Sequence, residues 1–279
     1  MLKTIIILIA CSGFVSCSEG QDTAPMPQKK LIWADEFDHT GLPDASKWDY
    51  ETGFVRNEEA QYYTPGRKEN AFVTNGHLVI TAVKERYKNP NYQPGSPDWR
   101  LNREYADYTS ASLITKGKFT VKYGRIEVRA KLPSGNGTWP AVWMLGTNIS
   151  QTGWPRCGEI DIMEFLGKEP RRIYGTCHWG DAEGKHKSGG KHIDVTPLPA
   201  EDFHVYAVDW YSDRIEFFYD DRLYFTFNTG IADNGTDNAF RKPYYLLINL
   251  ALGGWGGEID DSKGPWKYYI DYVRIYSFE

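Results

Sequence analysis

The sequence predicts an all-β fold, a two-sheet antiparallel β-sandwich of the jelly-roll type. Apolar and polar residues alternate with a period of two through most of the chain, as they do in half-buried strands. Turn signals such as Asn75-Gly76 and Asp220-Asp221 separate these runs. After residue 30 we find no convincing amphipathic helix, no internal repeat and no second linker. The clearest expected strands, in chain order, are 77–83, 125–130, 203–210, 215–219, 222–227, 244–250 and 268–276.

Length and composition exclude some classes of protein. A chain of 279 residues is long for one domain, yet all-β sandwiches reach this length undivided. The net charge of −5 argues against a nucleic-acid partner, which normally leaves a basic surface. The aromatic fraction of 15% suits a protein that stacks against sugar rings, but β proteins are rich in aromatic residues in any case. Composition leaves both interpretations open, and we expect a monomer.

The N-terminus predicts export and a lipid anchor. Lys3 precedes an apolar run at 5–10 that is too short to span a bilayer and is typical of a signal peptide. Phe14-Val15-Ser16-Cys17 resembles a bacterial lipobox, in which Cys17 would be lipidated; the alternative, Cys11, would leave a very short apolar region. We expect a lipoprotein of the bacterial outer membrane that contacts the membrane through this lipid only, facing the surface or the periplasm. The expected organisation is a signal peptide at 1–16, a flexible tether at 17–30 and one domain at 31–279.

Three acids stand close together in the segment Gly-Glu-Ile-Asp-Ile-Met-Glu-Phe at 158–165. On a regular strand Glu159 and Asp161 share a face, but Glu164 would point to the opposite one. A one-residue bulge near Met163 would return Glu164 to the face of the other acids. Mutual repulsion would then raise at least one pKa, so that one carboxyl group holds a proton near neutral pH. Glycoside hydrolysis requires such a pair of acids, although a solvated acidic strand face would explain the three acids equally well.

The motif Glu-x-Asp-x-x-Glu at 159–164 resembles the active-site signature of glycoside hydrolase family 16 in its bulged, laminarinase-like form. The resemblance extends over residues 31–279, and its other motifs follow one another in the order of that family. These motifs lie at 33–37, 57–64, 123–131, 137–144, 154–155, 249–254 and 271–276. The chain is therefore similar to endo-β-1,3(4)-glucanases of a bacterial lipoprotein type, and the resemblance implies a lectin-like jelly roll with a concave substrate cleft.

The resemblance implies a retaining endo-glycosidase that hydrolyses β-1,3-glucan or mixed-linkage β-1,3/1,4-glucan through a glycosyl-enzyme intermediate. It implies Glu159 as nucleophile, Glu164 as general acid/base and Asp161 as the residue that orients the nucleophile, without a catalytic cofactor. Relatives that cleave agar, porphyran or carrageenan leave a galactan open as the substrate. A catalytically inactive glycan-binding lipoprotein with the same fold is the other alternative.

Six more residues are candidates for contact with the sugar: Asn57, Trp139, Trp143, His178, Asn249 and Trp255. Trp139 and Trp143 share a strand face, and they would form a stacking floor if that face lines the cleft, or core if it does not. Trp255 lies in a glycine-rich loop, where we expect it to be exposed. His178 ends the strand after the acids, where it is as easily structural as functional. Many relatives carry an arginine where this chain has Ser112.

Two further features concern metal and sulfur. The resemblance implies a structural calcium ion on the convex side, held by Glu36, the carbonyl of Gly76 and Asp271, which form a hard-oxygen set. Cys157 and Cys177 are the two cysteines of the mature domain. They are either a disulfide, which export permits, or two buried free thiols.

Overall fold

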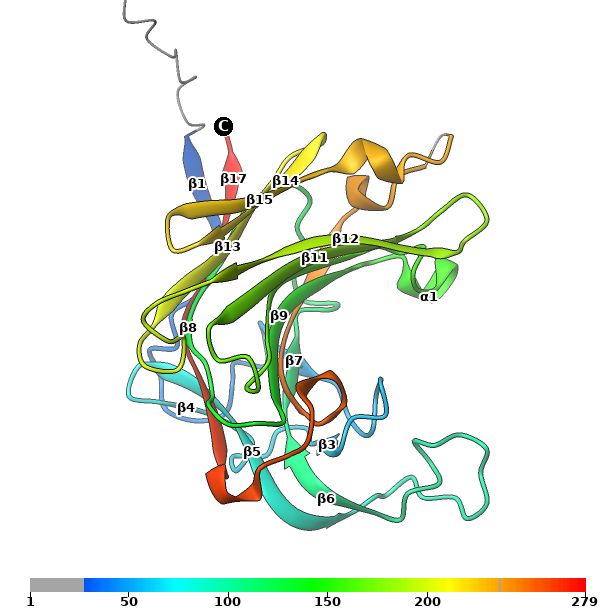
Figure 1. Ribbon diagram of the computed structural model, residues 1–279, viewed down its shortest axis with the longest axis vertical. Coiled ribbons are helices and arrows are strands. Elements are labelled where there is room, and N and C mark those ends of the chain that lie inside the picture. The colour runs from blue at the N-terminus through cyan, green and yellow to red at the C-terminus, as the bar shows by residue number, and fades with distance from the viewer. Residues whose placement is uncertain (1–27, 236) are drawn as a thin grey trace, which may run out of the picture.

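The computed structural model describes residues 28–235 and 237–279, and two stacked β-sheets make up most of this part of the chain (Figure 1). The predicted all-β sandwich is therefore confirmed. The strands of the outer sheet are β1 (Lys29–Asp35), β3 (Gln61–Tyr63), β4 (Ala71–Thr74), β5 (His77–Lys88), β6 (Tyr105–Ser110), β8 (Gly124–Lys131), β13 (His204–Trp210), β14 (Arg214–Tyr219), β15 (Arg222–Asn228) and β17 (Trp266–Phe278). Their order is β15-β14-β13-β8-β17-β5-β6-β3, with β1 pairing with β17 and β4 with β5.

The inner sheet carries the candidate site. Its strands are β2 (Asp49–Tyr50), β7 (Ser112–Ile114), β9 (Thr138–Gly146), β10 (Glu159–Phe165), β11 (Arg172–Gly180), β12 (His186–Asp194) and β16 (Tyr244–Leu252). Their order is β12-β11-β10-β9-β16-β7-β2, and the sheet curves with the outer sheet behind its convex side (Figure 1). Short helices lie in the loops: α1 (Ile149–Thr152) and the 3₁₀ turns η1 (Thr229–Ala232), η2 (Ala239–Arg241), η3 (Gly254–Gly256) and η4 (Asp261–Lys263).

Alternation along the strands places the main core between the two sheets. On β8, Ile126, Val128 and Ala130 are fully buried, while the residues between and after them are partly exposed. Strand β16 differs, because all nine of its residues are buried. Its even-numbered residues from Leu246 enter the main core, whereas Leu247 packs in a second apolar cluster with Trp143 on the other face. The inner sheet is thus apolar on both faces at its centre.

The domain begins slightly earlier than the sequence suggests. Strand β1 starts at Lys29, which pairs with Phe278 of β17, so residues 29 and 30 belong to the sandwich and not to the tether. The predicted lipidation site Cys17 lies outside the described residues. Among the described helices, none has the length and apolarity needed to cross a membrane.

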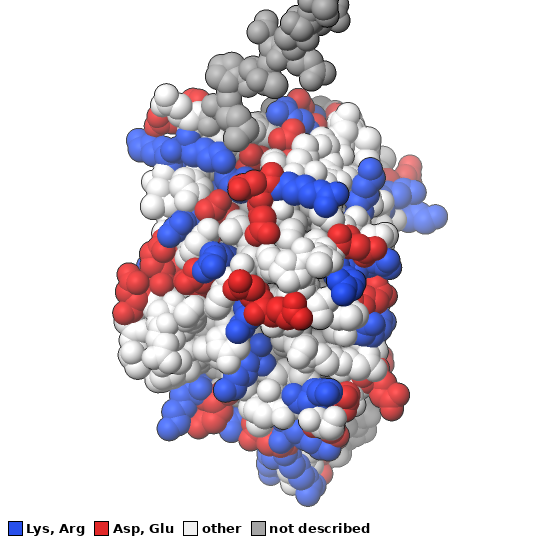
Figure 2. All heavy atoms as spheres, turned by 60° about the vertical axis from the view of Figure 1, so that its left-hand side comes forward, with Lys and Arg blue, Asp and Glu red and all other residues white. Residues whose placement is uncertain are grey.

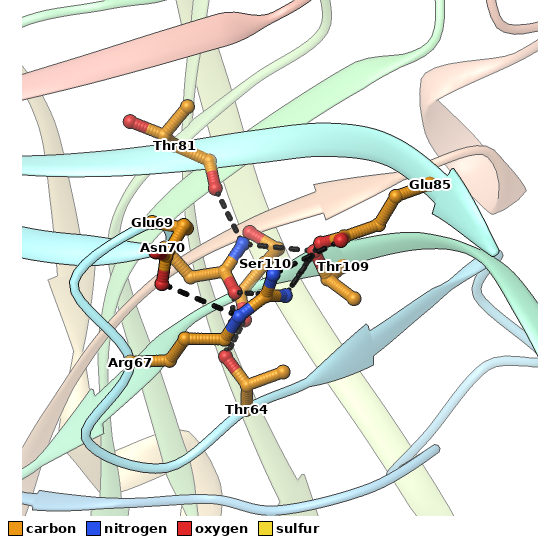
Figure 3. A network of polar contacts seen from close by, with 8 residues as sticks. All are labelled: Thr64, Arg67, Glu69, Asn70, Thr81, Glu85, Thr109 and Ser110. Atoms are coloured by element: carbon orange, nitrogen blue, oxygen red, sulfur yellow. Dashed lines mark hydrogen bonds and ion pairs between the residues drawn. The ribbon is translucent and has the colours of Figure 1, made fainter. Parts of the chain in front are cut away.

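A polar network fixes the loop that follows β3 (Figure 3). Arg67 forms an ion pair with Glu85 of β5, with Nη2 and Oε2 2.9 Å apart. Asn70 accepts a hydrogen bond from the Thr64 hydroxyl at 2.7 Å and donates one to the Thr109 hydroxyl of β6 at 3.0 Å. Because β3 adjoins this loop, the network ties the end of that strand to β5 and β6 of the same sheet.

Charges of both signs are interspersed on the outer-sheet side of the molecule (Figure 2). The two carboxylates predicted to bind calcium take part in ion pairs here. Glu36 accepts two hydrogen bonds from Arg274, at 2.8 and 2.9 Å. Asp271 accepts one from Arg129 at 2.5 Å. Each of these carboxylates therefore already has a cationic partner.

The two cysteines of the domain are buried free thiols. The structure therefore contains two free thiols at these positions and no Cys157–Cys177 disulfide.

Candidate active site

A bulge in β10 brings the outer two acids onto one face of the inner sheet. Glu159 lies opposite Leu145 of β9, and Glu164 lies opposite Ala141. The register shifts after Asp161, so five steps along β10 match four steps along β9. An even number of steps returns a side chain to the same face of the sheet. The predicted bulge is confirmed.

The opposite face of β10 is sealed in the core. Ile160, Ile162 and Met163 all belong to the main apolar cluster between the sheets. Two consecutive residues can enter the core only because the strand is irregular there. The apolar side chains therefore hold the strand, and the acids face outward into the cleft.

Two tryptophans donate hydrogen bonds to the two glutamates. The indole Nε1 of Trp154 donates to Glu159 Oε2 at 2.9 Å. The indole Nε1 of Trp139 donates to Glu164 Oε1 at 3.1 Å. A donor of this kind stabilises the ionised carboxylate. Trp154 is half exposed, and although its motif precedes the acids in the sequence, a role for it was not predicted.

Burial raises the pKa of all three acids, because a carboxylate loses hydration among protein atoms. The pKa of Glu159 rises to about 8, through burial first and then the charge of Asp161. The pKa of Glu164 rises to about 7, through burial first and then the charge of Glu159. Burial, with the charge of Glu164, raises the pKa of Asp161 well above its usual range. Because all three pKa values are raised, the site keeps at least one proton at neutral pH.

His178 of β11 lies beside these acids, which places it in the site. Its Nε2 is 3.1 Å from Asp161 Oδ2, and its Nδ1 is 2.9 Å from Nε2 of His186 on β12. The rings of the two histidines stack with centroids 5.1 Å apart. His186 also packs on the ring of Trp154 at 4.7 Å. Sequence reasoning missed His186, because only the pairing of β11 with β12 brings it to the acids.

The strand face that carries Trp139, Ala141 and Trp143 is the cleft face, not the core face. The residues that line the cleft are Arg56, Asn57, Glu59, Trp139, Ala141, Trp143, Leu145, Ile149, Trp154, Glu159, Asp161, Glu164 and Asn249. Four of the six predicted sugar-contact residues are in this set. His178 reaches it through Asp161, and Trp255, which is 41% exposed, packs edge-on against Trp139 with centroids 5.6 Å apart.

Trp143 and Asn249 form part of a buried chain of hydrogen bonds. The indole of Trp143 donates to Asn249 Oδ1 at 2.7 Å, and Asn249 Nδ2 donates to the hydroxyl of Tyr63 at 2.9 Å. That hydroxyl donates in turn to Glu59 Oε2 at 3.2 Å. Glu59 also accepts from Nδ2 of Asn57 at 3.2 Å. Asn249 is therefore placed to hold Trp143 in position within the cleft wall.

The loop before β3 contributes two cleft residues that the sequence did not suggest. The guanidinium of Arg56 lies 4.7 Å from the ring centroid of Trp143 and pairs with Glu51. Glu59 is 3% exposed, and burial raises its pKa. Charged residues in a polar loop are usually solvated, so composition offers no signal for either position.

Comparison with known proteins agrees with this geometry. The profile of the family described as Glycosyl hydrolases family 16 matches residues 58–274. A beta-glucanase of Rhodothermus marinus is 42% identical over 284 residues, covering 97% of this chain and 91% of its own length. The solved laminarinase from Rhodothermus marinus has a TM-score of 0.78 at 42% identity, covering 91% of this chain and 99% of its own. A chain solved in work on endo-acting O-glycanases, which prominent human gut bacteria express to initiate mucin breakdown, has a TM-score of 0.84. It is 37% identical and covers 90% of this chain and 91% of its own. The chain belongs to glycosyl hydrolases family 16.

Proposed function

We propose that the protein is a retaining endo-β-glucanase that hydrolyses β-1,3-glucan, mixed-linkage β-1,3/1,4-glucan, or both. The observation that carries this proposal is the bulge that presents Glu159 and Glu164 on one face of the cleft, where burial raises the pKa of both. The similarity to a beta-glucanase and a laminarinase supports glucan as the substrate class.

The reaction proceeds in two steps that need no cofactor. The Glu159 carboxylate attacks the anomeric carbon as Glu164 gives its proton to the leaving glycosidic oxygen, which forms a glycosyl ester on Glu159. Glu164, now ionised, takes a proton from water, and the resulting hydroxide attacks the same carbon and releases Glu159. Two inversions give net retention. Asp161 and His178 lie beside the nucleophile, where Asp161 can orient its carboxyl group.

Substitution of each glutamate tests the assignment. We expect Glu159→Gln and Glu164→Gln to abolish hydrolysis and keep the fold, because both side chains face the cleft. Azide should rescue Glu164→Gly with a β-configured product and Glu159→Gly with an α-configured product. Glu183→Gln, an exposed control, should retain full activity. Turnover close to that of the wild type in either catalytic variant would disprove the assignment, and exchanged product configurations would reverse the two roles.

A second substrate class has one observation in its favour. The chain solved in the work on mucin-degrading O-glycanases has a TM-score of 0.84, against 0.78 for the laminarinase. Its sequence identity is nevertheless lower, at 37% against 42%. The same two-carboxylate chemistry would then cut within an O-glycan chain. A digestion panel of laminarin, barley glucan, lichenan, agarose, carrageenan and desialylated mucin separates these substrates. Release of oligosaccharides from mucin alone would replace the glucan proposal.

Three further properties remain proposals: a lipid anchor on Cys17, a monomeric state and a structural calcium ion. Loss of labelled fatty acid in Cys17→Ser would support the anchor. The calcium ligands do not fit as they stand, because Glu36 and Asp271 bind Arg274 and Arg129. An ion at this position would have to displace both guanidinium groups.

A further inference from the structure

The guanidinium of Arg56 is fixed in the cleft before any ligand binds. It pairs with one oxygen of Glu51, whose other oxygen accepts a hydrogen bond from the Ser112 hydroxyl at 2.6 Å. It also lies over Trp143, which Asn249 holds in place. Contacts on two sides leave the group little freedom. The long side chain therefore loses little further entropy when it binds a ligand.

One nitrogen of this group is left without a partner. Among the described residues, Nη1 of Arg56 is buried and makes no hydrogen bond. A buried donor on a charged group is unfavourable when unpaired, and such groups need an explanation. Because Arg56 lines the same cleft as the catalytic acids, a ligand bound there would meet this guanidinium.

The surroundings of Arg56 identify the chemistry of that partner. Glu51 already balances the charge of the guanidinium, Glu59 is nearby, and the catalytic acids line the same cleft. A sulfate or carboxylate on the ligand would meet these negative groups, whereas a neutral hydroxyl can accept the N–H without repulsion. The Ser112 hydroxyl binds the other oxygen of Glu51 and so helps to hold that carboxylate against Arg56.

The strand pairing shows which part of a substrate would meet it. Trp143, beneath the guanidinium, is directly opposite Asp161 on the neighbouring strand β10. Adjacent strands lie about 5 Å apart, which is about the length of one sugar unit. We propose that Arg56 is a specificity-determining residue whose guanidinium donates a hydrogen bond to an uncharged hydroxyl of a sugar unit beside the reacting bond. This inference rests on the proposed endo-glycosidase function.

The test replaces the donor and keeps the packing. Arg56→Met retains an unbranched side chain over Trp143 but removes every N–H. We expect kcat/KM on the preferred glucan to fall about 10- to 150-fold, the effect of losing one hydrogen bond to a charged donor. The ratio of kcat/KM between laminarin and lichenan should change as well. The hydrogen bond from Arg56 can raise kcat/KM only for substrates whose linkage places a hydroxyl within its reach. Arg100→Met, which removes an exposed arginine paired with Asp98, is the matched control and should change neither value.

A second variant distinguishes charge from geometry. Arg56→Lys keeps the ion pair with Glu51 but cannot also direct a second donor into the cleft, so kcat/KM should stay low. Full activity in Arg56→Lys would overturn the hydrogen-bond assignment. A fall that is equal for all substrates and matches a loss of folded protein would show a structural role instead. If Arg56→Met affects only sulfated or carboxylated glycans, the partner is an anion and the proposal is wrong.

Failure of the proposed function gives a different result. In that case the wild type would cleave none of the glycans, whatever residue stands at 56. Titration of laminarihexaose into Glu159→Gln and into Glu159→Gln/Arg56→Met measures binding without turnover. Equal dissociation constants in the two proteins would overturn the role of Arg56 while leaving the catalytic assignment intact.

Discussion

Trp154 and Trp139 each use one indole N–H to stabilise one of the two glutamates as a carboxylate. Burial acts in the opposite direction and raises the pKa of both groups. The balance between these effects decides which carboxyl group carries the proton at a given pH. At the residue scale, then, the protonation of the site depends on side chains outside the catalytic motif.

This balance predicts a bell-shaped dependence of kcat/KM on pH. Below the lower apparent pKa both glutamates are protonated and no nucleophile exists; above the upper one both are ionised and no proton can reach the leaving group. The pKa values of about 7 for Glu164 and about 8 for Glu159 place both limbs well above those of ordinary carboxyl groups. Trp154→Phe removes the donor to Glu159, the group with the higher pKa, and should move the alkaline limb upward by about 0.5–1 pH unit. Trp99→Phe, outside the cleft, is the control, and an unchanged limb in Trp154→Phe would contradict the argument.

At the scale of one element, the entry to β10 depends on Gly158. This residue has φ +79° and precedes Glu159 directly. A Cβ atom here would lie 1.9 Å from the hydroxyl of Tyr244 and 2.9 Å from Cβ of Ala239. Tyr244 is fully buried and has no space to withdraw. The first acid of the site is therefore positioned by a close contact that only glycine permits.

Gly158→Ala should accordingly displace the start of β10 and lower both stability and activity. We expect a loss of about 1–3 kcal/mol in the free energy of unfolding, from overpacking and the positive φ together. Gly153→Ala separates the two causes, because Gly153 has φ +69° but no atom within 4 Å of the added Cβ. Equal losses from urea unfolding of both variants would show that the contact with Tyr244 is unimportant.

At the scale of the whole molecule, the catalytic acids reduce stability as pH rises. Their folded pKa values lie above the unfolded values, so the folded protein binds more protons than the unfolded chain in the interval between them. The stabilising contribution is complete below the unfolded pKa of about 4.5 and is lost as pH rises through the folded values of about 7 and about 8. The catalytic acids therefore lower the free energy of unfolding of the domain at neutral and alkaline pH.

Glu159→Gln should therefore melt at a higher temperature than the wild type at pH 8 and at a similar temperature at pH 5. Glutamine is neutral at every pH and resembles the protonated acid. Each additional kcal/mol in the free energy of unfolding raises the melting temperature by roughly 2–4 °C in a domain of this size. Glu183→Gln serves again as the exposed control. A gain that is equal at both pH values would contradict the linkage argument.

The sequence alone determined the local features, because they depend on neighbouring residues. Alternation of apolar residues predicted the strands and the sandwich, and the spacing of Glu159, Asp161 and Glu164 required a bulge that β10 contains. The expected start of the domain was displaced by two residues, because the pairing of Lys29 with Phe278 is a contact between the two ends of the chain.

Only the tertiary structure decided which surface each strand face belongs to. Period two shows that Trp139 and Trp143 share a face, but their strand β9 is buried on both faces along most of its length, so apolarity does not distinguish core from cleft. Arg56 and His186 reach the site from a loop and a strand far from β10 in the sequence. Their roles depend on contacts between separate segments of the chain, and a local sequence pattern does not predict such contacts.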